Sequence, residues 1–465
     1  MLESNLSQTL DSTERARDVL AGGCDSPVRS GWAVGGPMFV QASARGAYAY
    51  DESGRRYVDY VMAYGPLLFG HTHPALTTGL DELAQTGFVW GNTHTGEIRL
   101  GERIRSHLPS MQRMRFVTSG TEAVMSTIRV ARAFTRRDLV LKFAGNYHGH
   151  FDLALLDAGA SAHTRATGAG IPDGIVRDTV VARYNDLADV DALLRGRESS
   201  LAAILVEPIV ANMGYVAPQP GFLEGLRDRA SRYGALLIFD EVITWLRFGL
   251  RGAQGRLGIV PDLTALGKIM GGGTPIAAFG GRTDVMAVLA PDGVTFTGGT
   301  HGGNPFCVGM AHRVLDLLEA HPEYYDRMHG LARRLATGIR GVLTSRNLPY
   351  AVVHDESIVD FKFRRGGPTQ NYDDARSADA VAYAAYYHAM LERGILLPPS
   401  QNEVIFVSTA HTEADIDETI TAIGASFDCA PLRSSFECDR SARPSTALRS
   451  ARPSTALRSA QDDGG

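Results

Sequence analysis

Lysine is rare in this chain, and one of its three lysines lies in a setting suited to covalent chemistry. Lys142 and Lys362 occupy apolar runs typical of strands, whereas Lys268 is followed closely by Gly271–Gly273. Glycines let the backbone approach a ligand closely. A lysine amine must be deprotonated to attack a carbonyl group, and burial or a nearby cation lowers its pKa. If the chain forms a Schiff base, we therefore expect Lys268 to form it.

Two adjacent carboxylates follow a strongly apolar segment. Ala235–Phe239 predicts a strand buried on both faces, and Asp240 and Glu241 come directly after it. Such an acid can hold Mg²⁺ in an ATPase, pair with the protonated pyridine nitrogen of pyridoxal phosphate (PLP), or simply cap the strand end. The ATPase role requires a P-loop, but around the only Gly-Lys pair Asp262 stands at the earlier glycine position and Ile269 follows Lys268. The PLP interpretation is therefore favoured among the two cofactor roles.

A small polar turn, Thr118–Thr121, separates a predicted strand from a predicted helix with Glu122 in its first turn. Backbone N–H groups at a helix N-terminus, together with the hydroxyls of Ser119 and Thr121, make a site suited to phosphate. The same residue types also form an ordinary helix cap. Both interpretations stay open at this point.

The segment Gly145–His150 carries Tyr147 and His148 just after a predicted strand. An aromatic side chain in this place can stack on a flat cofactor ring. His148 and His150, together with His71 and His73, could instead form two His-x-His metal sites. No carboxylate nearby completes a ligand set, and zinc would need a third or fourth ligand. We therefore expect no metal.

The elements that must position these residues alternate between strands and helices from about residue 66 to 310. Such alternation predicts an α/β fold with a mostly parallel sheet, in which ligands bind at the carboxyl ends of the strands. The predicted strands are Arg115–Val117, Leu139–Phe143, Ala203–Val206 and Ala235–Phe239, and the predicted helices include Glu122–Phe134 and Gly221–Tyr233.

We expect four parts along the chain. Residues 1–65 form an N-terminal segment that contributes to a small domain, 66–310 a large cofactor-binding domain, 311–432 a smaller α+β domain, and 433–465 a disordered tail. The tail contains ARPSTALRS twice in tandem and has too little apolar surface to fold. The predicted elements outside the large domain are helices at residues 1–20, Ala311–Ala320, Tyr324–Ser345 and Ser377–Arg393 and strands at Met38–Val40, Ala47–Asp51 and Tyr57–Tyr60.

The composition excludes several functional classes. With 44% hydrophobic residues, 21% charged residues and a formal net charge of −5, the chain has no general attraction to nucleic acid or anionic membranes. No apolar run is long enough to span a bilayer, and the polar N-terminus does not resemble a signal peptide. The four cysteines are scattered without C-x-x-C spacing. We expect a cytoplasmic protein with no nucleic-acid or membrane partner.

Taken together, these stretches resemble the class III PLP-dependent aminotransferases, and within that family most closely the glutamate-1-semialdehyde 2,1-aminomutases. The likeness covers roughly residues 15–428. The motifs that carry it occur in the expected order: DSPVR at Asp25–Arg29, GPLLFGHTHP at Gly65–Pro74, FVTSGTEAVMS at Phe116–Ser126, KFAGNYHGHFD at Lys142–Asp152, VEPIVANMG at Val206–Gly214, LLIFDEV at Leu236–Val242, GKIMGGG at Gly267–Gly273 and PPSQNEVIFVSTAHT at Pro398–Thr412.

The resemblance implies the fold-type I architecture of PLP-dependent transferases and a homodimer with active sites at the subunit interface. It implies that Lys268 holds PLP as a Schiff base, that Asp240 pairs with the pyridine nitrogen and that Tyr147 stacks on the ring. These three are the candidate catalytic residues. The further candidates for cofactor binding are Ser119, Gly120, Thr121, His148, Glu207, Asn212, Val242 and, from the neighbouring subunit, Thr300.

On the substrate side, the resemblance implies that Arg29 meets a carboxylate and that Glu403 faces the active site. Three positions depart from the aminomutase pattern: Tyr64 replaces a tryptophan, His301 lies in an altered GTHGGNP motif, and Trp90 begins the unusual stretch WGNTHTGE. These five are the candidate substrate-binding residues. The departures leave the cofactor chemistry intact and put the substrate in question.

The expected activity is therefore that of an aminotransferase, which moves an amino group between an amino acid and a 2-oxo acid. A β- or ω-amino acid is the candidate donor. The alternative is a glutamate-1-semialdehyde 2,1-aminomutase, which makes the tetrapyrrole precursor 5-aminolevulinate by moving nitrogen to the adjacent carbon.

Overall fold

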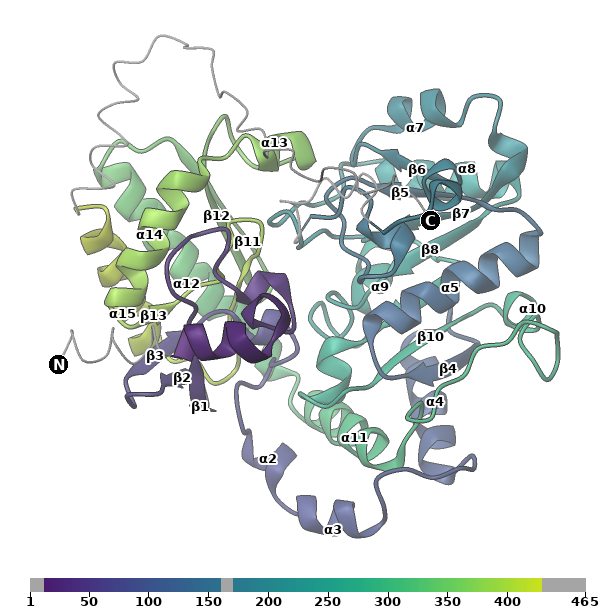
Figure 1. The fold of residues 1–465 in the computed structure, drawn as a ribbon, viewed down its shortest axis with the longest axis horizontal. Helices are drawn as coiled ribbons and strands as arrows, with labels where there is room; N and C mark the ends of the chain where they lie inside the picture. Colours follow the sequence, from purple (N-terminus) through teal and green to yellow (C-terminus); the bar gives the residue numbers. More distant parts are fainter. Residues whose placement is uncertain (1–11, 160–169, 429–465) are drawn as a thin grey trace, which may run out of the picture.

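A seven-stranded sheet forms the centre of the larger part of the molecule (Figure 1), in a computed structural model that describes residues 12–159 and 170–428. Its strand order is β4-β10-β9-β8-β7-β5-β6, and neighbouring strands run parallel except beside β10. The strands are β4 (Arg113–Val117), β5 (Leu139–Phe143), β6 (Thr179–Ala182), β7 (Leu201–Val206), β8 (Leu236–Asp240), β9 (Leu263–Leu266) and β10 (Ala277–Gly281). The predicted α/β fold with a mostly parallel sheet is confirmed.

Helices cover both faces of this sheet because its central strands are apolar along their length. β5, β7 and β8 are buried at every residue, as is usual for parallel strands. Successive side chains face opposite sides, so Ile238 packs with α5 (Gly120–Thr135) while Leu237 packs with α8 (Phe222–Tyr233). The other helices of this part are α2 (Pro74–Thr77), α3 (Leu80–Gln85), α4 (Thr95–His107), α6 (Asp173–Arg177), α7 (Leu187–Leu194), α9 (Gly252–Leu257), α10 (Thr283–Met286) and α11 (Pro305–Ala320).

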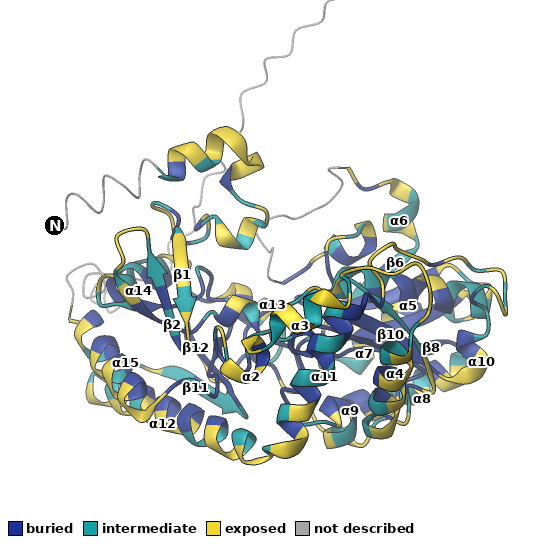
Figure 2. Ribbon diagram, turned by 90° about the horizontal axis from the view of Figure 1, so that it is seen from below, coloured by how far each residue is buried: buried dark blue, intermediate teal, exposed yellow. Residues whose placement is uncertain are grey.

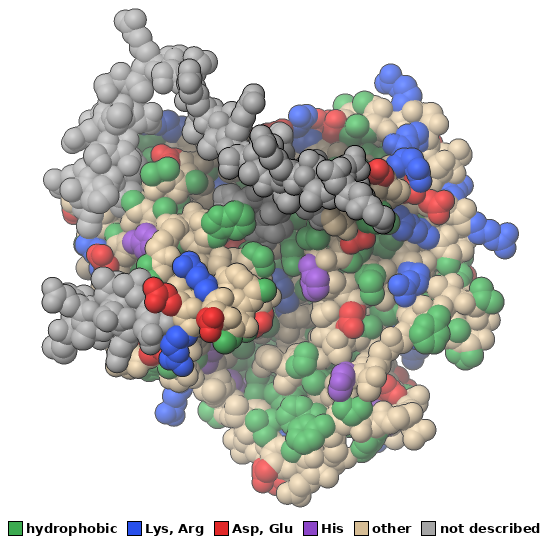
Figure 3. Space-filling view, in the orientation of Figure 1, with side chains coloured by type: hydrophobic (Ala, Val, Ile, Leu, Met, Phe, Trp, Pro, Cys, Tyr) green, Lys and Arg blue, Asp and Glu red, His purple; other side chains and the backbone are tan. Residues whose placement is uncertain are grey.

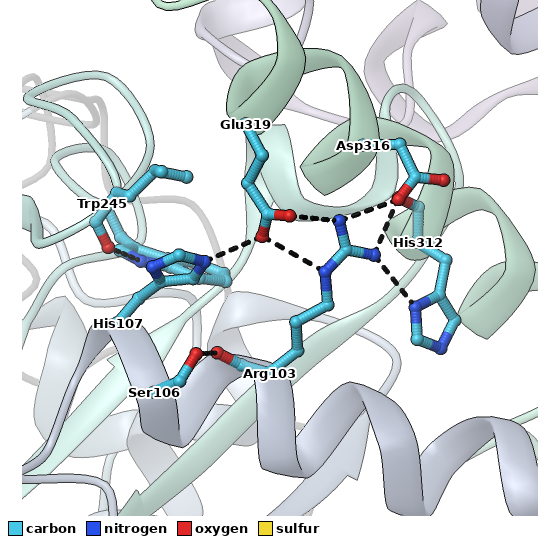
Figure 4. A network of polar contacts seen from close by, with 8 residues as sticks. Arg103, Ser106, His107, Trp245, His312, Asp316 and Glu319 are labelled. Atoms are coloured by element: carbon cyan, nitrogen blue, oxygen red, sulfur yellow. Dashed lines mark hydrogen bonds and ion pairs between the residues drawn. The ribbon is translucent and has the colours of Figure 1, made fainter.

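A polar network joins α4 to α11 (Figure 4). Arg103 of α4 donates to both carboxylate oxygens of Glu319, at 3.1 and 2.8 Å, and forms an ion pair of 2.7 Å with Asp316. At the N-terminal ends of the same helices, His94 Nε2 donates to the carbonyl oxygen of Gly303 at 2.7 Å. These contacts therefore hold the segment before α4, which carries Trp90, against the segment before α11, which carries His301.

The smaller part combines two short sheets with long helices. One sheet has the order β1-β2-β3-β13, with β13 parallel to β3, and the other has the antiparallel order β11-β12-β14. Figure 2 shows that α12 and α15 turn exposed faces outward and buried faces toward these sheets. The elements are β1 (Gln41–Arg45), β2 (Tyr48–Asp51), β3 (Arg56–Asp59), α12 (Glu323–Ser345), β11 (Tyr350–Asp355), β12 (Ile358–Arg365), α13 (Tyr372–Arg376), α14 (Ala380–Glu392), β13 (Ile395–Leu396), β14 (Ile405–Phe406) and α15 (Glu413–Ser426).

The predicted boundary between the large and small domains lies within a helix. The division that we placed between residues 310 and 311 falls inside α11, which starts at Pro305 because Asn304 caps it by accepting from the Cys307 N–H at 2.9 Å. Buried residues of α11 pack in one cluster with Leu100 of α4 and Ile276 of the large part. We therefore propose that the small domain begins after α11.

One predicted strand is wrong, and three strands of the large sheet were missed. Met38–Val40 is not a strand, since β1 starts at Gln41, and β6, β9 and β10 were not predicted. The sequence of β10, Ala-Ala-Phe-Gly-Gly, has little β-propensity. Its last glycine is needed because a Cβ atom on Gly281 would lie 2.0 Å from the carbonyl oxygen of Asp262 in the neighbouring strand connection.

Residues 12–19 are helical, so the helix predicted at residues 1–20 lies only partly within the described residues, and the tail predicted at 433–465 lies wholly outside them. None of the helices in the described part of the chain has the length and apolar character needed to cross a bilayer. The cytoplasmic location stays a prediction.

Candidate active site

A cavity of about 170 Å³ lies where the central parallel strands end. Because carboxyl ends of parallel strands meet at one edge of a sheet, the segments that follow β5, β7, β8 and β9 converge there. The residues that line the cavity are Gly120, Thr121, Tyr147, His148, Gly149, Glu207, Asn212, Asp240, Val242, Ile243 and Lys268. Most of the residues predicted to bind the cofactor therefore lie around one space.

Lys268 follows β9 and starts the short 3-10 helix η6 (Lys268–Gly271). Its φ of 48° is in the left-handed region, which costs a residue with a Cβ atom roughly 1 kcal/mol, so the surrounding structure must hold it there. Burial lowers the pKa of the Lys268 amine, although the carboxylates of Glu403, Glu207 and Asp240 act in the opposite direction. A lowered pKa favours the neutral amine that covalent chemistry requires.

Asp240 ends β8 and is held by two donors. Its Oδ2 accepts from His148 Nδ1 at 2.8 Å, and its Oδ1 accepts from the Val242 N–H at 3.1 Å. Burial lowers the pKa of His148, which makes the neutral imidazole, with Nδ1 carrying the proton, the form that fits this contact. Asp240 is thus an oriented carboxylate at the cavity wall, as needed to keep a pyridine nitrogen protonated.

Glu207, which follows β7, joins this strand to the segment after β5. Its carboxylate accepts from the Tyr147 N–H at 2.7 Å and from Asn212 Nδ2 at 2.9 Å, while the Glu207 N–H donates to Asn146 Oδ1 at 3.0 Å. Burial, followed by the charge of Asp240, raises the pKa of Glu207 to about 8. Asn146 was not predicted, although it lies within the GNYHGH motif.

The N-terminus of α5 forms the opposite end of the cavity. Gly120 and Thr121 line it, whereas the Ser119 hydroxyl accepts from the Glu122 N–H at 3.2 Å and so serves as the helix cap. A Cβ atom on Gly120 would lie 3.0 Å from Val242, and one on Gly149 would lie 2.4 Å from Thr121 Oγ1. These glycines keep space at a helix terminus that attracts anions. A direct role of Ser119 at the phosphate stays a prediction.

The arrangement fits PLP. The helix N-terminus suits its phosphate, Asp240 its ring nitrogen and Lys268 its aldehyde, while Tyr147 and Val242 line the space between them. Within the described residues, no group of three or more His, Cys, Asp and Glu side chains could hold a metal ion. Two of the histidines considered as metal ligands contact carboxylates instead, His148 at Asp240 and His71 at Asp59.

A second, larger cavity of about 430 Å³ is lined by Arg29 and Tyr64, with Asp59 and His71 in its wall. The Tyr64 hydroxyl donates to the carbonyl oxygen of Val28 at 3.1 Å, next to Arg29. Burial raises the pKa of Tyr64, and the charge of Glu403 adds to that effect. Two of the five predicted substrate residues therefore share this space.

Glu403 is buried and lies within electrostatic reach of both Tyr64 and Lys268. Burial raises its pKa to about 7, against the charges of Lys268 and Lys362, which lower it. A buried carboxyl with a pKa near neutrality can hold a proton close to the reacting atoms.

Thr300, His301 and Trp90 lie elsewhere in this chain. Thr300 and His301 are exposed and line a separate cavity of about 280 Å³ beside Glu122. Trp90 is 46% exposed and packs edge-on against His94 with ring centroids 5.2 Å apart. The predicted roles of these three residues stay predictions.

Arg247, a buried residue whose charge acts on Lys268, was not predicted from the sequence. Arg247 lies in the apolar run Ile243–Phe248, and its pKa is lowered to about 9 by burial. A charged residue within an apolar run was the sequence signal that could have identified it.

Comparisons with known proteins identify the family of this chain. The family model for class-III aminotransferases matches residues 32–426. The chain is 45% identical over 414 residues to a glutamate-1-semialdehyde 2,1-aminomutase of Roseiflexus castenholzii, covering 88% of this chain and 94% of the relative. A solved transaminase with PLP bound is 28% identical, with a TM-score of 0.82 and coverage of 92% and 99%.

A second solved structure, a glutamate-1-semialdehyde aminomutase from Pseudomonas aeruginosa in complex with PMP, is 26% identical. Its TM-score is 0.80, and the match covers 91% of this chain and 94% of that one. Since the family model spans most of the chain and these neighbours share its architecture, this chain belongs to the class-III aminotransferases and is a PLP-dependent enzyme.

Proposed function

We propose that the enzyme is a glutamate-1-semialdehyde 2,1-aminomutase that produces 5-aminolevulinate. The observation that carries the proposal is that Arg29 is the one guanidinium among the described residues that line the larger cavity, so this cavity offers one guanidinium to a substrate carboxylate. This substrate has one carboxylate, whereas 2-oxoglutarate, a common amino acceptor, has two. The 45% sequence identity to a glutamate-1-semialdehyde 2,1-aminomutase supports the same choice. We therefore prefer the aminomutase, which the sequence offered as the alternative, to the aminotransferase.

We assign each residue of the site a role in the proposed reaction. When bound, PLP supplies an electron sink for negative charge on the substrate carbon next to nitrogen. Asp240 keeps that sink effective by holding a proton on the ring nitrogen. Arg29 binds the substrate carboxylate, and the neutral amine of Lys268 takes the proton from one substrate carbon and returns a proton at another position. Glu403 holds a proton nearby and, because it is buried, helps to exclude water.

An aminotransferase remains the second candidate because Arg29 itself is exposed. An exposed anchor permits one substrate to leave before another binds, which external transamination requires. Tyr64, at the position of the aminomutase tryptophan, lines the same cavity and would tune this choice.

The two activities can be separated with purified enzyme. We expect kcat/KM for conversion of glutamate-1-semialdehyde to 5-aminolevulinate to exceed that for any pairing of an amino acid with pyruvate or 2-oxoglutarate by roughly 100-fold or more. Liquid chromatography with mass detection would follow both products in parallel. Transamination that equals or exceeds 5-aminolevulinate formation would reject the proposal.

The proton on Glu403 gives a pH-dependent effect on stability. Its folded-state pKa of about 7 lies above the ordinary 4.5, so the folded protein binds the extra proton and loses stability as pH rises from about 4.5 to 7. Glu403→Gln should remove this loss and raise the unfolding free energy relative to wild type more at pH 8 than at pH 5, by up to about 3 kcal/mol.

Urea unfolding of the two proteins at both pH values measures this difference. Asp417→Asn on α15 is the control, because that exposed carboxylate pairs with Arg334, which lowers its pKa, so its replacement should not stabilise the protein at pH 8. An effect of Glu403→Gln that is the same at both pH values would contradict the assigned proton.

We also propose that the enzyme is a homodimer in which Thr300 of one subunit completes the cofactor cavity of the other. Phe88, Trp90 and Phe296 are 60%, 46% and 76% exposed, and these rings lie in the segments before α4 and near Thr300. Figure 3 shows hydrophobic side chains open to solvent in the region of α2 and α3. Burial of such surface in a dimer would stabilise it.

Light scattering should give a mass of twice the chain's 50.0 kDa. Mixing Lys268→Ala with Thr300→Asp, each inactive alone, should restore activity, because a mixed dimer contains one site with both wild-type residues. A mass of one chain, or no recovery in verified mixed dimers, would argue against shared sites.

A further inference from the structure

Arg247 is a fully buried guanidinium that has no carboxylate partner among the described residues. It is 1% exposed. One of its terminal nitrogens donates to Ser357 Oγ at 2.7 Å, and the other donates to the carbonyl oxygen of Gly65. Its guanidinium carbon lies 4.5 Å from the centre of the Phe406 ring. Burying a charge without a counter-ion costs several kcal/mol, so the contacts that it makes need an explanation.

The contact with Gly65 ends an unusual turn. Met62, Ala63, Tyr64 and Gly65 have φ values of 44°, 54°, 64° and 113°, four left-handed residues in succession. Three of them carry a Cβ atom, and each such residue costs roughly 1 kcal/mol or more in this conformation. A turn of this kind persists only if its surroundings hold it.

Two charged side chains hold the turn from opposite ends. At its start, Asp59 Oδ1 accepts from the N–H groups of Val61 and Met62 at 2.8 and 3.2 Å. At its end, Arg247 holds the Gly65 carbonyl and rests on Phe406 of β14. Arg247 thereby ties the loop after Asp240 to the turn and to the small sheet.

The turn contacts both the larger cavity and the Lys268 side chain. Ala63 and Tyr64 line the larger cavity together with Arg29. Gly65 packs on the other side, where a Cβ atom would lie 3.6 Å from Lys268 Cδ and 3.3 Å from Phe406 Cζ. A shift of the turn would therefore move Tyr64 away from the substrate and remove a support of the Lys268 side chain.

We propose that Arg247 is a positioning residue that locks the turn Met62–Gly65, and with it Tyr64 and Lys268, in the geometry that the reaction requires. The part that concerns Tyr64 rests on the substrate-side cavity proposed above. The part that concerns Lys268 does not depend on which substrate is used. A guanidinium suits the position because its two terminal nitrogens, held at a fixed separation in one plane, donate to Ser357 and Gly65, whereas a lysine amine has all its donors on one nitrogen.

The charge of Arg247 adds a second effect on Lys268. After burial, which lowers the pKa of Lys268 most, Arg247 lowers it further, while Glu403, Glu207 and Asp240 raise it. Removal of the Arg247 charge should therefore raise the pH at which the nitrogen of Lys268 loses its proton. In the cofactor-loaded enzyme, that titration is visible in the absorbance of the bound PLP.

The test compares Arg247→Met and Arg247→Lys with wild type in two readouts. Arg247→Met should raise KM for glutamate-1-semialdehyde roughly 10-fold or more, as expected for loss of a charge-assisted hydrogen bond, and should shift the absorbance titration to higher pH. Compared with Arg247→Met, Arg247→Lys restores the positive charge but not the two separate donor nitrogens. It should therefore return the absorbance titration toward that of wild type and leave KM raised. Arg256→Met is the matched control, because Arg256 lies 5.1 Å from the Phe248 ring and pairs with Asp355 outside the site.

The outcomes decide the proposal. If Arg247→Met has the KM and the absorbance titration of wild type, Arg247 does not position the turn and the proposal is overturned. If the methionine and lysine variants change both readouts by the same amount, the changes reflect a general effect on folding, and the proposal is overturned as well. If Arg247→Met does not fold, Arg247→Lys carries the test, and a wild-type KM there would overturn the proposal. If glutamate-1-semialdehyde is not a substrate, the absorbance titration still reports on Arg247, so the two proposals fail separately.

Discussion

The buried contact between Asp240 and His148 is the interaction on which the site depends. A carboxylate can lie at the end of the apolar strand β8 only because a neutral histidine and a backbone N–H hold it. If Asp240 pairs with the pyridine nitrogen as we propose, its fixed position would give the cofactor ring one favourable orientation. The glycines at 120 and 149, the N-terminus of α5 and the amine of Lys268 then surround the remaining space.

The two lysines other than Lys268 are buried and donate hydrogen bonds to backbone carbonyl groups. Lys142 is fully buried and donates to the carbonyl oxygen of Ala154 at 2.8 Å, and burial lowers its pKa to about 7. Lys362, also buried, donates to the carbonyl oxygen of Gln401, two residues before Glu403. Both lysines thus donate to backbone carbonyl groups, and Arg247 does the same for the turn at Tyr64.

Most of the residues predicted to bind the cofactor line one cavity, whereas those predicted to bind the substrate are spread over several places, for a physical reason. Tyr147 follows β5 and Asp240 ends β8, two strands with strong apolar signals, and parallel topology brings such strand ends together. Lys268 follows β9, which was not predicted, and it was singled out instead by the scarcity of lysine and by the glycines that follow it. Ser119 caps α5 in this structure, and Trp90 and His301 are exposed away from the cofactor cavity, so their predicted roles stay predictions. Strand β10 escaped prediction because pairing with β4 and β9, rather than local propensity, makes it a strand.

The central claim is that PLP is bound through Lys268, and the chain's three lysines make a direct test possible. Borohydride reduction of the purified holoenzyme would fix the cofactor to its lysine, and mass spectrometry of proteolytic peptides would locate it. We predict that the peptide containing Lys268 carries the mass of the reduced cofactor and that the peptides containing Lys142 and Lys362 do not. Cofactor mass on either of those two peptides, or none on any, would contradict it.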